Sequence, residues 1–471
     1  MSEVVAAPVW EARSLREVVT KLVDGSHNPP PKQETGLPML SARNIDRGQV
    51  LFDDYRLISE SAFVSENART RIAPGDVLLT IVGTIGRTAV VPEGSPPFSL
   101  QRSVAVLTPS ANLLSKFLCY QFESPAIQKH FEANARGTAQ KGVYLNTLGQ
   151  TPVVLPPLDV QREIVAEIEK QFSRLDEAVA NLQRVKANLK RYKASVLKAA
   201  VEGRLVETEA SLAHREGRTY ENGEQLLQRI LAERLGKWVG KRKYREPVTP
   251  ETEALSASPE GWVWASPEQV SAGEPYSLAI GPFGSSLKVS DYKTEGVPLV
   301  FVRNIRSGSF GGENTVYVTA DKAVELSAHS VEAGDILVTK MGDPPGDVCR
   351  YPANRPLAVI TADCIKLRVT KVGIDPAFIE YAMASRVVQD QILGITKGVA
   401  QLKVNLANFS SIALPLPPHA AQARIVAEVD RHLSIVREVE AEVDTNLQRA
   451  HALRQATLAK IFRQTKKWGE D

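Results

Sequence analysis

Three polar side chains in the first quarter of the chain have the chemistry to read DNA bases. Arg87, Gln101 and Arg102 stand in segments expected to form loops beside short β-rich runs. Arginine forms paired hydrogen bonds with the guanine edge, and glutamine does so with adenine. We therefore predict that these residues contact bases, although a solvated loop charge is the alternative for each.

A comparable loop in the second half of the chain carries different charges. Lys340, Asp343 and Asp347 follow the strand-like segment Gly334-Asp335-Ile336-Leu337-Val338-Thr339. An aspartate carboxylate can accept a hydrogen bond from cytosine N4. These residues are therefore the corresponding base-contact candidates, again with a solvated charge as the alternative.

Other polar residues are shared by both halves. Arg43-Asn44 returns as Arg303-Asn304. A shared contact suits phosphate, which carries no sequence information, while a structural cap is the open alternative. Gly137-Thr138-Ala139-Gln140 returns as Gly398-Val399-Ala400-Gln401, where the glycine serves either a backbone approach to phosphate or a tight turn. The DNA-contact candidates of this segment are Gln140, Lys141, Lys397, Gln401 and Lys403.

Signatures of catalysis are weak. Asn28-Pro29-Pro30-Pro31 and Asp343-Pro344-Pro345-Gly346 resemble a loop of adenine methyltransferases, but both lack the aromatic residue that would stack on a flipped base. No glycine-rich loop for S-adenosylmethionine follows a strand, and no GxxxxGK[ST] phosphate loop occurs. We therefore expect no catalytic residues in this chain.

Composition narrows the class of protein. A formal net charge of +3 does not by itself demand a nucleic-acid partner, so local groups must make that case. Three widely spaced cysteines and seven scattered histidines predict neither a disulfide framework nor a metal site. No run of 18 apolar residues occurs, so no membrane span is expected. The expected location is the cytoplasm.

The candidate residues lie in a domain that the chain contains twice. Gly36-Leu37-Pro38 returns as Gly296-Val297-Pro298, at an offset of 260 residues. A nearly constant offset of this length indicates a duplicated domain and not a solenoid, whose units repeat about every 20 to 50 residues. Comparison of the copies places Ala362-Asp363 where the first copy has Gln101-Arg102.

A long helix is expected after each copy. Asp159 is a favourable N-cap, and neither proline nor glycine occurs again before Gly203, a plausible stop. One heptad stripe contains Ile168, Leu175, Leu182, Leu189 and Val196, and a second contains Ile164, Ala178, Val185, Tyr192 and Ala199. The later helix has Val429, Val436, Val443 and Ala450. Such stripes predict an antiparallel coiled coil, with packing of each helix on its own domain as the alternative.

The predicted fold class is α+β: two similar mixed α/β domains separated by two long helices that form an antiparallel, pseudo-twofold symmetric coiled coil. Shorter helices are expected over Leu113–Phe131 and Gln225–Trp238. The predicted division is a first domain at 1–157, a long helix at 158–205, an amphipathic helix with a basic, proline-rich linker at 206–258, a second domain at 259–418, a second long helix at 419–466 and a tail at 467–471.

This layout resembles the specificity subunit of type I restriction-modification enzymes. The resemblance covers nearly the whole chain and rests on motifs that occur twice. Gly-Asp-[Val/Ile]-Leu-[Leu/Val]-Thr stands at 75–80 and 334–339. Leu-Pro-Pro, a glutamine and Ile-Val-Ala-Glu stand at the start of each long helix, at 155–167 and 416–428. Pro259-Glu260-Gly261-Trp262-Val263-Trp264 is also similar to the family.

The resemblance implies a non-catalytic subunit with two target-recognition domains, each reading one half of a bipartite, asymmetric site in double-stranded DNA. The helix pair is then a spacer that docks two methyltransferase subunits, and restriction/motor subunits complete the enzyme. Adenine-N6 methylation and ATP-dependent cleavage belong to those partners. S-adenosylmethionine, and ATP with magnesium, are accordingly expected on the partners, and no cofactor on this chain.

A coiled-coil scaffold that presents two protein- or peptide-binding domains is the alternative function. It would use the same pair of helices. The loops distinguish the two functions, because DNA contact requires Arg, Lys, Gln and Asn side chains at the domain tips.

Overall fold

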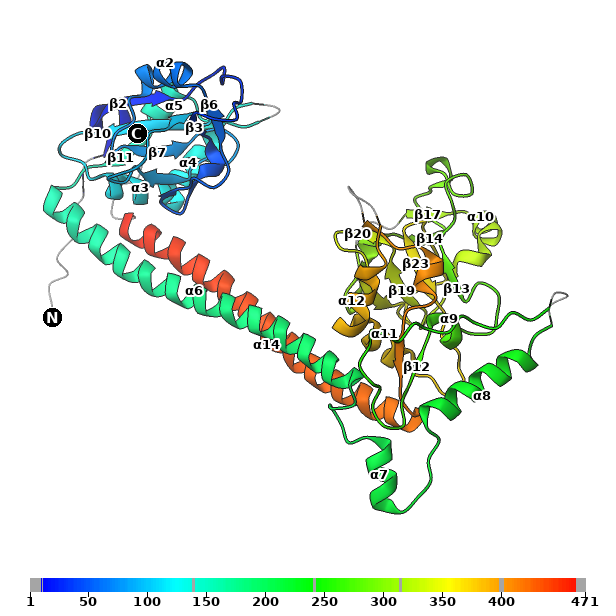
Figure 1. Ribbon diagram of the computed structural model, residues 1–471. Helices are drawn as coiled ribbons and strands as arrows, with labels where there is room; N and C mark the ends of the chain where they lie inside the picture. The colour runs from blue at the N-terminus through cyan, green and yellow to red at the C-terminus, as the bar shows by residue number, and fades with distance from the viewer. Residues whose placement is uncertain are drawn as a thin grey trace. The chain divides into compact units, whose positions relative to one another are not determined.

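The computed structural model describes residues 10, 12–137, 140–239, 243–312, 316–397 and 402–462. The chain forms two compact units. Unit 1 comprises Met1–Val185 with Glu442–Asp471, and unit 2 comprises Lys186–Ala441. Each unit contains one copy of the repeated domain and parts of both long helices (Figure 1).

Unit 1 is built on a four-stranded sheet and a three-stranded sheet. The first has the order β2 (Val19–Asp24), β10 (Val104–Pro109), β7 (Val77–Thr80), β8 (Thr88–Val90), and the second has β6 (Arg56–Ile58), β3 (Leu37–Leu40), β9 (Ser99–Leu100). Two-stranded pairs are β1 (Ala12–Ser14) with β11 (Pro152–Val154) and β4 (Ile45–Asp46) with β5 (Gln49–Val50). The helices are α1 (Leu15–Val18), α2 (Glu60–Thr70), α3 (Ser115–Glu123), α4 (Pro125–Asn134) and α5 (Leu145–Gly149).

Strand β7 explains how the core of unit 1 is divided. All four of its residues are buried, and successive side chains of a strand point to opposite faces. Val77 and Leu79 therefore join one apolar cluster with Phe117 of α3, while Leu78 joins a second cluster with Leu40 of β3. The central sheet is buried on both faces.

The helix expected over Leu113–Phe131 is instead two helices, so that prediction was wrong in its extent. Helix α3 ends at Glu123 and α4 begins at Pro125. Ser124 between them has extended backbone, with ψ of 145°. Proline disfavours the helical conformation of the residue before it, which breaks the helix at this point.

Unit 2 repeats this plan. Its larger sheets have the orders β13 (Leu278–Ile280), β23 (Cys364–Leu367), β19 (Ile336–Thr339), β21 (Val348–Arg350) and β17 (Val316–Val318), β14 (Val297–Val300), β22 (Ala358–Ile360), β18 (Ser330–Val331). Its pairs are β12 (Val263–Ala265) with β25 (Leu414–Leu416), β15 (Ile305–Arg306) with β16 (Ser309–Phe310) and β20 (Met341–Gly342) with β24 (Leu402–Lys403). Its main helices are α9 (Pro267–Val270), α10 (Ala320–Glu325), α11 (Pro376–Ala384), α12 (Arg386–Gly394) and α13 (Leu406–Phe409).

Strand register fixes how the two copies correspond. Leu40 of β3 pairs with Leu100 of β9, and Val300 of β14 pairs with Ile360 of β22. Leu40 and Val300 are 260 residues apart, and so are Leu100 and Ile360. The offset becomes 261 only beyond the equivalent residues Leu107 and Leu367, because α3 begins eight residues after Leu107 and α11 begins nine residues after Leu367.

The predicted correspondence of Gln101-Arg102 with Ala362-Asp363 was therefore wrong by one residue. Gln101 N–H donates to Leu40 O, and Thr361 N–H makes the equivalent bond to Val300 O. Gln101 corresponds to Thr361, and Arg102 corresponds to Ala362. The prediction used the offset of 261 residues that holds near the long helices, whereas these strands correspond at an offset of 260.

The two long helices are α6 (Leu158–Val201) and α14 (His419–Phe462). Asp159 lies in the first turn of α6 and is not its N-cap, because the helix already begins at Leu158. The predicted stop at Gly203 is confirmed. Its φ is +66°, and the N–H of Arg204 donates to Ala199 O, the pattern of a left-handed helix C-terminus.

Within unit 1 the helices pack on each other in antiparallel order. Thr457 Oγ1 lies 3.3 Å from Gln171 Oε1, and Arg454 pairs with Asp176 at 2.9 Å, so rising numbers in α6 meet falling numbers in α14. Phe462 joins the domain core. The predicted fold class, two mixed α/β domains with two long packed helices, is confirmed.

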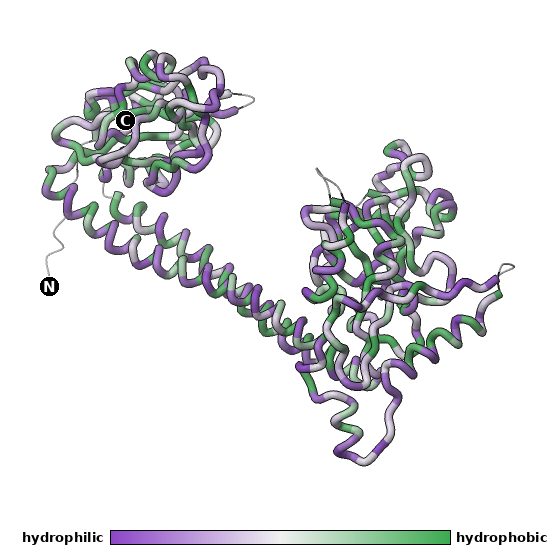
Figure 2. The backbone as a smooth tube through the Cα atoms, in the orientation of Figure 1, coloured by the Kyte–Doolittle hydropathy of each residue, from purple (hydrophilic) through white to green (hydrophobic). Residues whose placement is uncertain are grey.

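The two heptad stripes of α6 differ in burial. Ile168 and Val196 of the first stripe are buried, whereas Ala178, Val185 and Tyr192 of the second are exposed. In α14 the predicted stripe of Val429, Val436, Val443 and Ala450 is buried throughout. Figure 2 shows hydrophobic positions recurring among hydrophilic ones along both helices.

Two shorter helices, α7 (Glu209–Glu216) and α8 (Gly223–Gly236), follow α6 in unit 2. Leu226 and Ile230 of α8 are buried in the core of that unit. Helix α8 is the amphipathic helix expected over Gln225–Trp238, begun two residues earlier. Across the described part of the chain, every helix is too short or too polar to span a membrane.

Candidate nucleic-acid interface

Polar side chains of unit 1 gather in an open cleft of about 320 Å³, which we call the strand-end cleft. It is lined by loops that leave β2, β3, β7 and β9 and by the loop before α5. Its residues are His27, Pro29, Ser41, Ala42, Arg43, Val82, Gly83, Thr84, Gln101, Arg102, Ser103 and Gln140.

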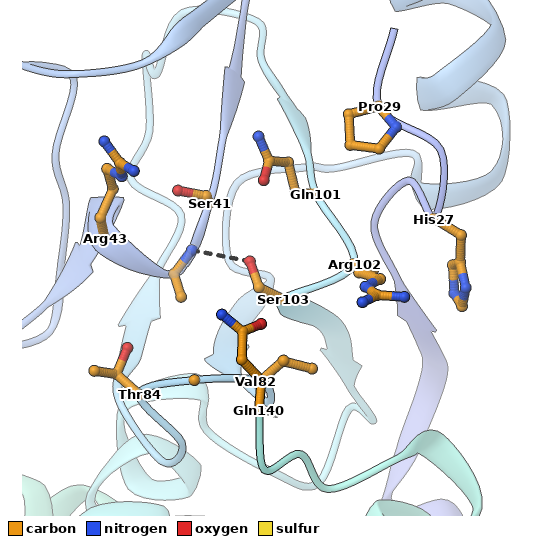
Figure 3. A pocket seen from close by; sticks show the side chains of 12 residues that line it. His27, Pro29, Ser41, Arg43, Val82, Thr84, Gln101, Arg102, Ser103 and Gln140 are labelled. Carbon is orange, nitrogen blue, oxygen red and sulfur yellow. Dashed lines mark hydrogen bonds between the residues drawn. The ribbon is translucent and has the colours of Figure 1, made fainter. Parts of the chain in front are cut away.

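The sheets bring these distant segments together. Strand β10 begins between the ends of β2 and β7, so the loops of all three meet at one edge. Backbone bonds fix the loops there: Arg102 N–H donates to Ser26 O at 2.9 Å, and Ala42 N–H donates to Ser103 Oγ at 3.1 Å. Figure 3 shows the second bond within the cleft.

The chemistry of the cleft suits hydrogen bonding to an anionic ligand. In Figure 3, Arg43 and Arg102 lie on opposite sides, with Gln101, Ser103 and Gln140 between them. Among the described residues that line the cleft, none is acidic. Guanidinium, amide and hydroxyl groups that converge in this way can contact both phosphates and base edges.

The histidine at the cleft is held from behind. His27 Nε2 lies 2.7 Å from Asp24 Oδ2, and the Arg69 guanidinium donates to the other oxygen of that carboxylate at 2.8 Å. Asp24 is buried, whereas the His27 side chain is 58% exposed. Asp24 thus positions an imidazole that remains open to the cleft.

The backbone of Gly137 is compatible with a tight turn, one of its two alternatives. Its φ is +121°, and a Cβ on it would lie 2.3 Å from the Gln140 carbonyl oxygen. Arg136 and Gly142 pair through their backbones, and Gly83 N–H donates to Lys141 O at 3.1 Å. The turn therefore brings Gln140 to the cleft, with exposed Lys141 beside it.

Four predicted DNA contacts, Arg43, Gln101, Arg102 and Gln140, thus lie at one place. Arg87 does not line this cleft. Its guanidinium pairs with Asp46 at 3.4 Å, in a groove that residues of α6 and α14 also line. The structure therefore separates Arg87 from the other candidate readers of unit 1.

The shared asparagines are buried structural caps. Asn44 is 1% exposed; its Oδ1 accepts from Ser41 N–H, and its Nδ2 donates to Leu51 O. Asn304 repeats these bonds with Phe301 N–H and Gly311 O. This geometry favours the cap over phosphate contact for both residues. The neighbouring Arg43 side chain is exposed and pairs with Asp54 at 2.7 Å.

The unit 2 candidates surround the equivalent strand ends. Lys340 Nζ donates to Ala362 O at 3.2 Å, and Asp347 Oδ1 accepts from Ser307 Oγ at 2.5 Å. The Arg303 guanidinium stacks over the Phe301 ring at 4.2 Å.

The remaining unit 2 candidates are exposed or undescribed. Asp343, Lys397 and Lys403 are exposed, and the backbones of Lys397 and Lys403 pair with each other. Gln401 lies outside the described residues.

Sequence reasoning missed His27 and Ser103 as members of the cleft. Both follow strand ends, but nothing in their local sequence sets them apart from ordinary loop residues. The feature that marks the loop of His27 is a close contact of its backbone. Gly25, before His27, has no room for a side chain because a Cβ would lie 2.2 Å from Leu100 O.

The strong pKa shifts in unit 2 arise mainly from burial. Burial raises the pKa of the Cys349 and Cys364 thiols to about 12. Burial also lowers the pKa of Lys366 to about 8, and its Nζ donates to Ser330 O at 2.7 Å. In the described ranges no three His, Cys, Asp or Glu side chains cluster as a metal site would require.

Comparison with known proteins agrees with these observations. A family model for the type I restriction modification DNA specificity domain matches residues 10–191. The specificity subunit of the type I restriction enzyme EcoBI from Escherichia coli is 22% identical over 433 residues, which cover 92% of this chain and 80% of that protein. The EcoKI specificity subunit from Escherichia coli strain K12 is 25% identical over 205 residues, 42% of this chain and 43% of that protein.

A solved structure from work on complex assembly and conformational transition of the type I R-M system has the same fold. The alignment covers 97% of this chain and 98% of the solved chain, with a TM-score of 0.61 and 20% identity. The family-model match contains the first domain and most of α6, and unit 2 repeats the four-stranded sheet of that domain with the same strand order. Residues 10–191 therefore match the type I restriction modification DNA specificity domain, and the chain over most of its length is similar to the specificity subunits of type I restriction enzymes.

Proposed function

We propose that unit 1 and unit 2 each read one half of an asymmetric, bipartite site in double-stranded DNA. The strand-end cleft is the observation that carries this proposal. It gathers two guanidinium groups and two carboxamides from segments far apart in sequence, and none of its described lining residues is acidic. The equivalent strand ends of unit 2 carry different side chains, so the half-sites differ.

The cleft residues have distinct proposed roles. Arg102 contacts a guanine and Gln101 an adenine, since these side chains match those base edges. Arg43, Gln140 and Lys141 contact phosphate or sugar and position the domain. Arg87 is a weaker reader, because its guanidinium is already paired with Asp46.

The proposed contacts of unit 2 follow the same division. Lys340, Asp343 and Asp347 contact bases, although the bond from Ser307 already engages Asp347. Arg303, Lys397, Gln401 and Lys403 contact the DNA backbone. The domain division predicted from the sequence, with recognition domains at 1–157 and 259–418, is part of this proposal.

The partners proposed are two methyltransferase subunits and restriction/motor subunits, acting in the cytoplasm. Val185 of α6 is 38% exposed and offers an apolar contact on which a partner can pack. S-adenosylmethionine, and ATP with magnesium, bind to those partners in this proposal. The two long helices set the number of base pairs between the half-sites.

Replacement of Arg102 by alanine tests the reading role. The variant is produced with its methyltransferase partner, and methylated adenines are mapped by long-read sequencing. We expect discrimination to relax at one position of one half-site, by roughly 5- to 150-fold for one bidentate contact. The other half-site stays unchanged, because unit 2 keeps its residues.

Lys116→Ala is the matched control. It removes one positive charge from unit 1 at an exposed side chain on α3, outside the cleft. The control variant should retain the full motif. If the methylated DNA motif of the Arg102→Ala variant is unchanged, or weakens equally in both half-sites, base reading by Arg102 is contradicted.

A further inference from the structure

Phe283 of unit 2 stands where unit 1 has His27. Gly25 N–H donates to Val104 O, and Gly281 N–H makes the equivalent bond to Cys364 O, both at 3.1 Å. A Cβ on Gly281 would lie 2.1 Å from Thr361 O, directly after β22, and a Cβ on Gly25 would lie 2.2 Å from Leu100 O, at the end of the equivalent strand β9. The two loops therefore leave their sheets alike, and Phe283 and His27 each lie two residues farther on.

One charged side chain at the His27 loop has no equivalent in unit 2. Arg102, which lines the cleft beside His27, corresponds to Ala362 in unit 2. The side chain of Phe283 is nevertheless 66% exposed. A large apolar side chain at a binding edge, left open to water by its own domain, is suited to apolar contact with a ligand.

Lys340 limits how the ring of Phe283 can be used. Its Nζ lies over the ring, 5.7 Å from the centroid, and the same nitrogen donates to the carbonyl of Ala362. A ring inserted between two base pairs needs both faces free for stacking. With a cation over one face, the phenyl group offers its other face and its edge.

We propose that Phe283 contacts the 5-methyl group of a thymine in the half-site read by unit 2. The thymine methyl is the one apolar group on the major-groove edge of a base pair, and phenylalanine is among the side chains that suit it. This inference rests on the proposed function and adds a base preference to it. At this loop position unit 1 has the hydrogen-bonding side chain of His27, whereas in unit 2 the ring of Phe283 contacts a methyl group.

Deoxyuridine tests the contact directly, because it differs from thymidine only by that methyl group. The chain is assembled with its methyltransferase partner, and the motif is mapped. Each thymine of the unit 2 half-site is then replaced singly by deoxyuridine in a binding probe. We expect one position at which the loss of the methyl group weakens binding about fourfold.

The Phe283→Ala complex should bind the thymidine probe more weakly by a similar factor and should not distinguish deoxyuridine at that position. Phe283→Leu retains an apolar side chain and should keep most of the discrimination. Val324→Ala is the matched control, since Val324 is 74% exposed and lies on α10 of the same unit. It should behave as the unmodified chain.

Three results would overturn the inference. The unmodified complex could bind thymidine and deoxyuridine equally at every position, or the half-site could contain no thymine on either strand. Phe283→Ala could also weaken binding while leaving the deoxyuridine effect intact, which would indicate a wedge between base pairs. If the unmodified complex retains its sequence-specific binding in these cases, the proposed function stands. A complex without sequence-specific binding would refute the proposed function itself.

Discussion

Neighbouring residues of one dipeptide can differ sharply in burial, as Arg43 and Asn44 illustrate. Both recur in the second copy, so the sequence gives them the same weight. The structure separates them by burial: the Arg43 side chain is 68% exposed, while Asn44 is 1% exposed and bonded to backbone groups of its own unit. Recurrence alone does not distinguish a ligand contact from a cap.

Asn44→Ala should therefore act on stability and not on specificity. The substitution leaves Ser41 N–H and Leu51 O without their partner, which costs about 1 to 3 kcal/mol for buried groups. Denaturant unfolding of the variant should show this loss, while the methylated motif stays the same.

Arg43→Ala is the companion variant for this test. Its exposed ion pair with Asp54 contributes at most about 1 kcal/mol, so stability should change little while DNA affinity falls. An Asn44→Ala chain of full stability with weakened DNA binding would show that the asparagine is a ligand contact.

Residue types and the repeat were enough to identify four of the cleft residues. They were not enough to place Arg87 in a different groove or to include His27. Gly25 and Leu100 approach each other closely, and only the fold brings them together. The error of one residue in matching Arg102 arose because one copy has a longer loop far from this site.

At the scale of elements, one glutamine joins each long helix to its domain. Gln161 of α6 is fully buried; its Oε1 accepts from Leu114 N–H before α3, and its Nε2 donates to Asn112 O. Gln422 of α14 repeats this with Asp375 N–H and Gly373 O. The recurring Leu-Pro-Pro and glutamine motif is thus a joint between helix and domain.

Gln161→Ala should loosen the joint in unit 1. It removes the partners of two part-buried groups, the Leu114 N–H and the Asn112 carbonyl, at a cost of about 1 to 3 kcal/mol. Hydrogen exchange should accelerate at the Leu114 amide and in the first turns of α6. Gln171→Ala is the control, because Gln171 lies on the same helix without bonds to the domain sheets. Unchanged exchange at Leu114 would contradict the role of Gln161.

Long helices were predictable because a heptad repeat is a local pattern that continues for many turns. The break between α3 and α4 also follows from the local sequence Ser124-Pro125. It was not predicted because the apolar residues on either side of it keep a helical spacing. The paired strands of the two sheets were less accessible, since β9 has only two residues and pairs with β3, far away in sequence.

At the scale of the whole molecule, duplication followed by divergence accounts for the asymmetric site that we propose for this chain. The two units share strand order, buried caps and helix joints. They differ at the strand ends, where His27 and Arg102 of unit 1 correspond to Phe283 and Ala362 of unit 2. Scaffold positions are thus retained while the proposed contact positions have changed independently.

If the long helices set the gap between the half-sites, their length should be visible in the DNA motif. Seven residues added at matching heptad positions of both α6 and α14 keep the apolar stripe in register and lengthen each helix by about 10 Å. At about 3.4 Å per base pair, the gap should grow by roughly three base pairs while both half-sites keep their sequences. Seven residues inserted after Gly217, in the loop that follows α7, are the control and should leave the gap unchanged. Methylation mapping that finds intact half-sites with the original gap in the lengthened chain would rule out the helices as the spacer.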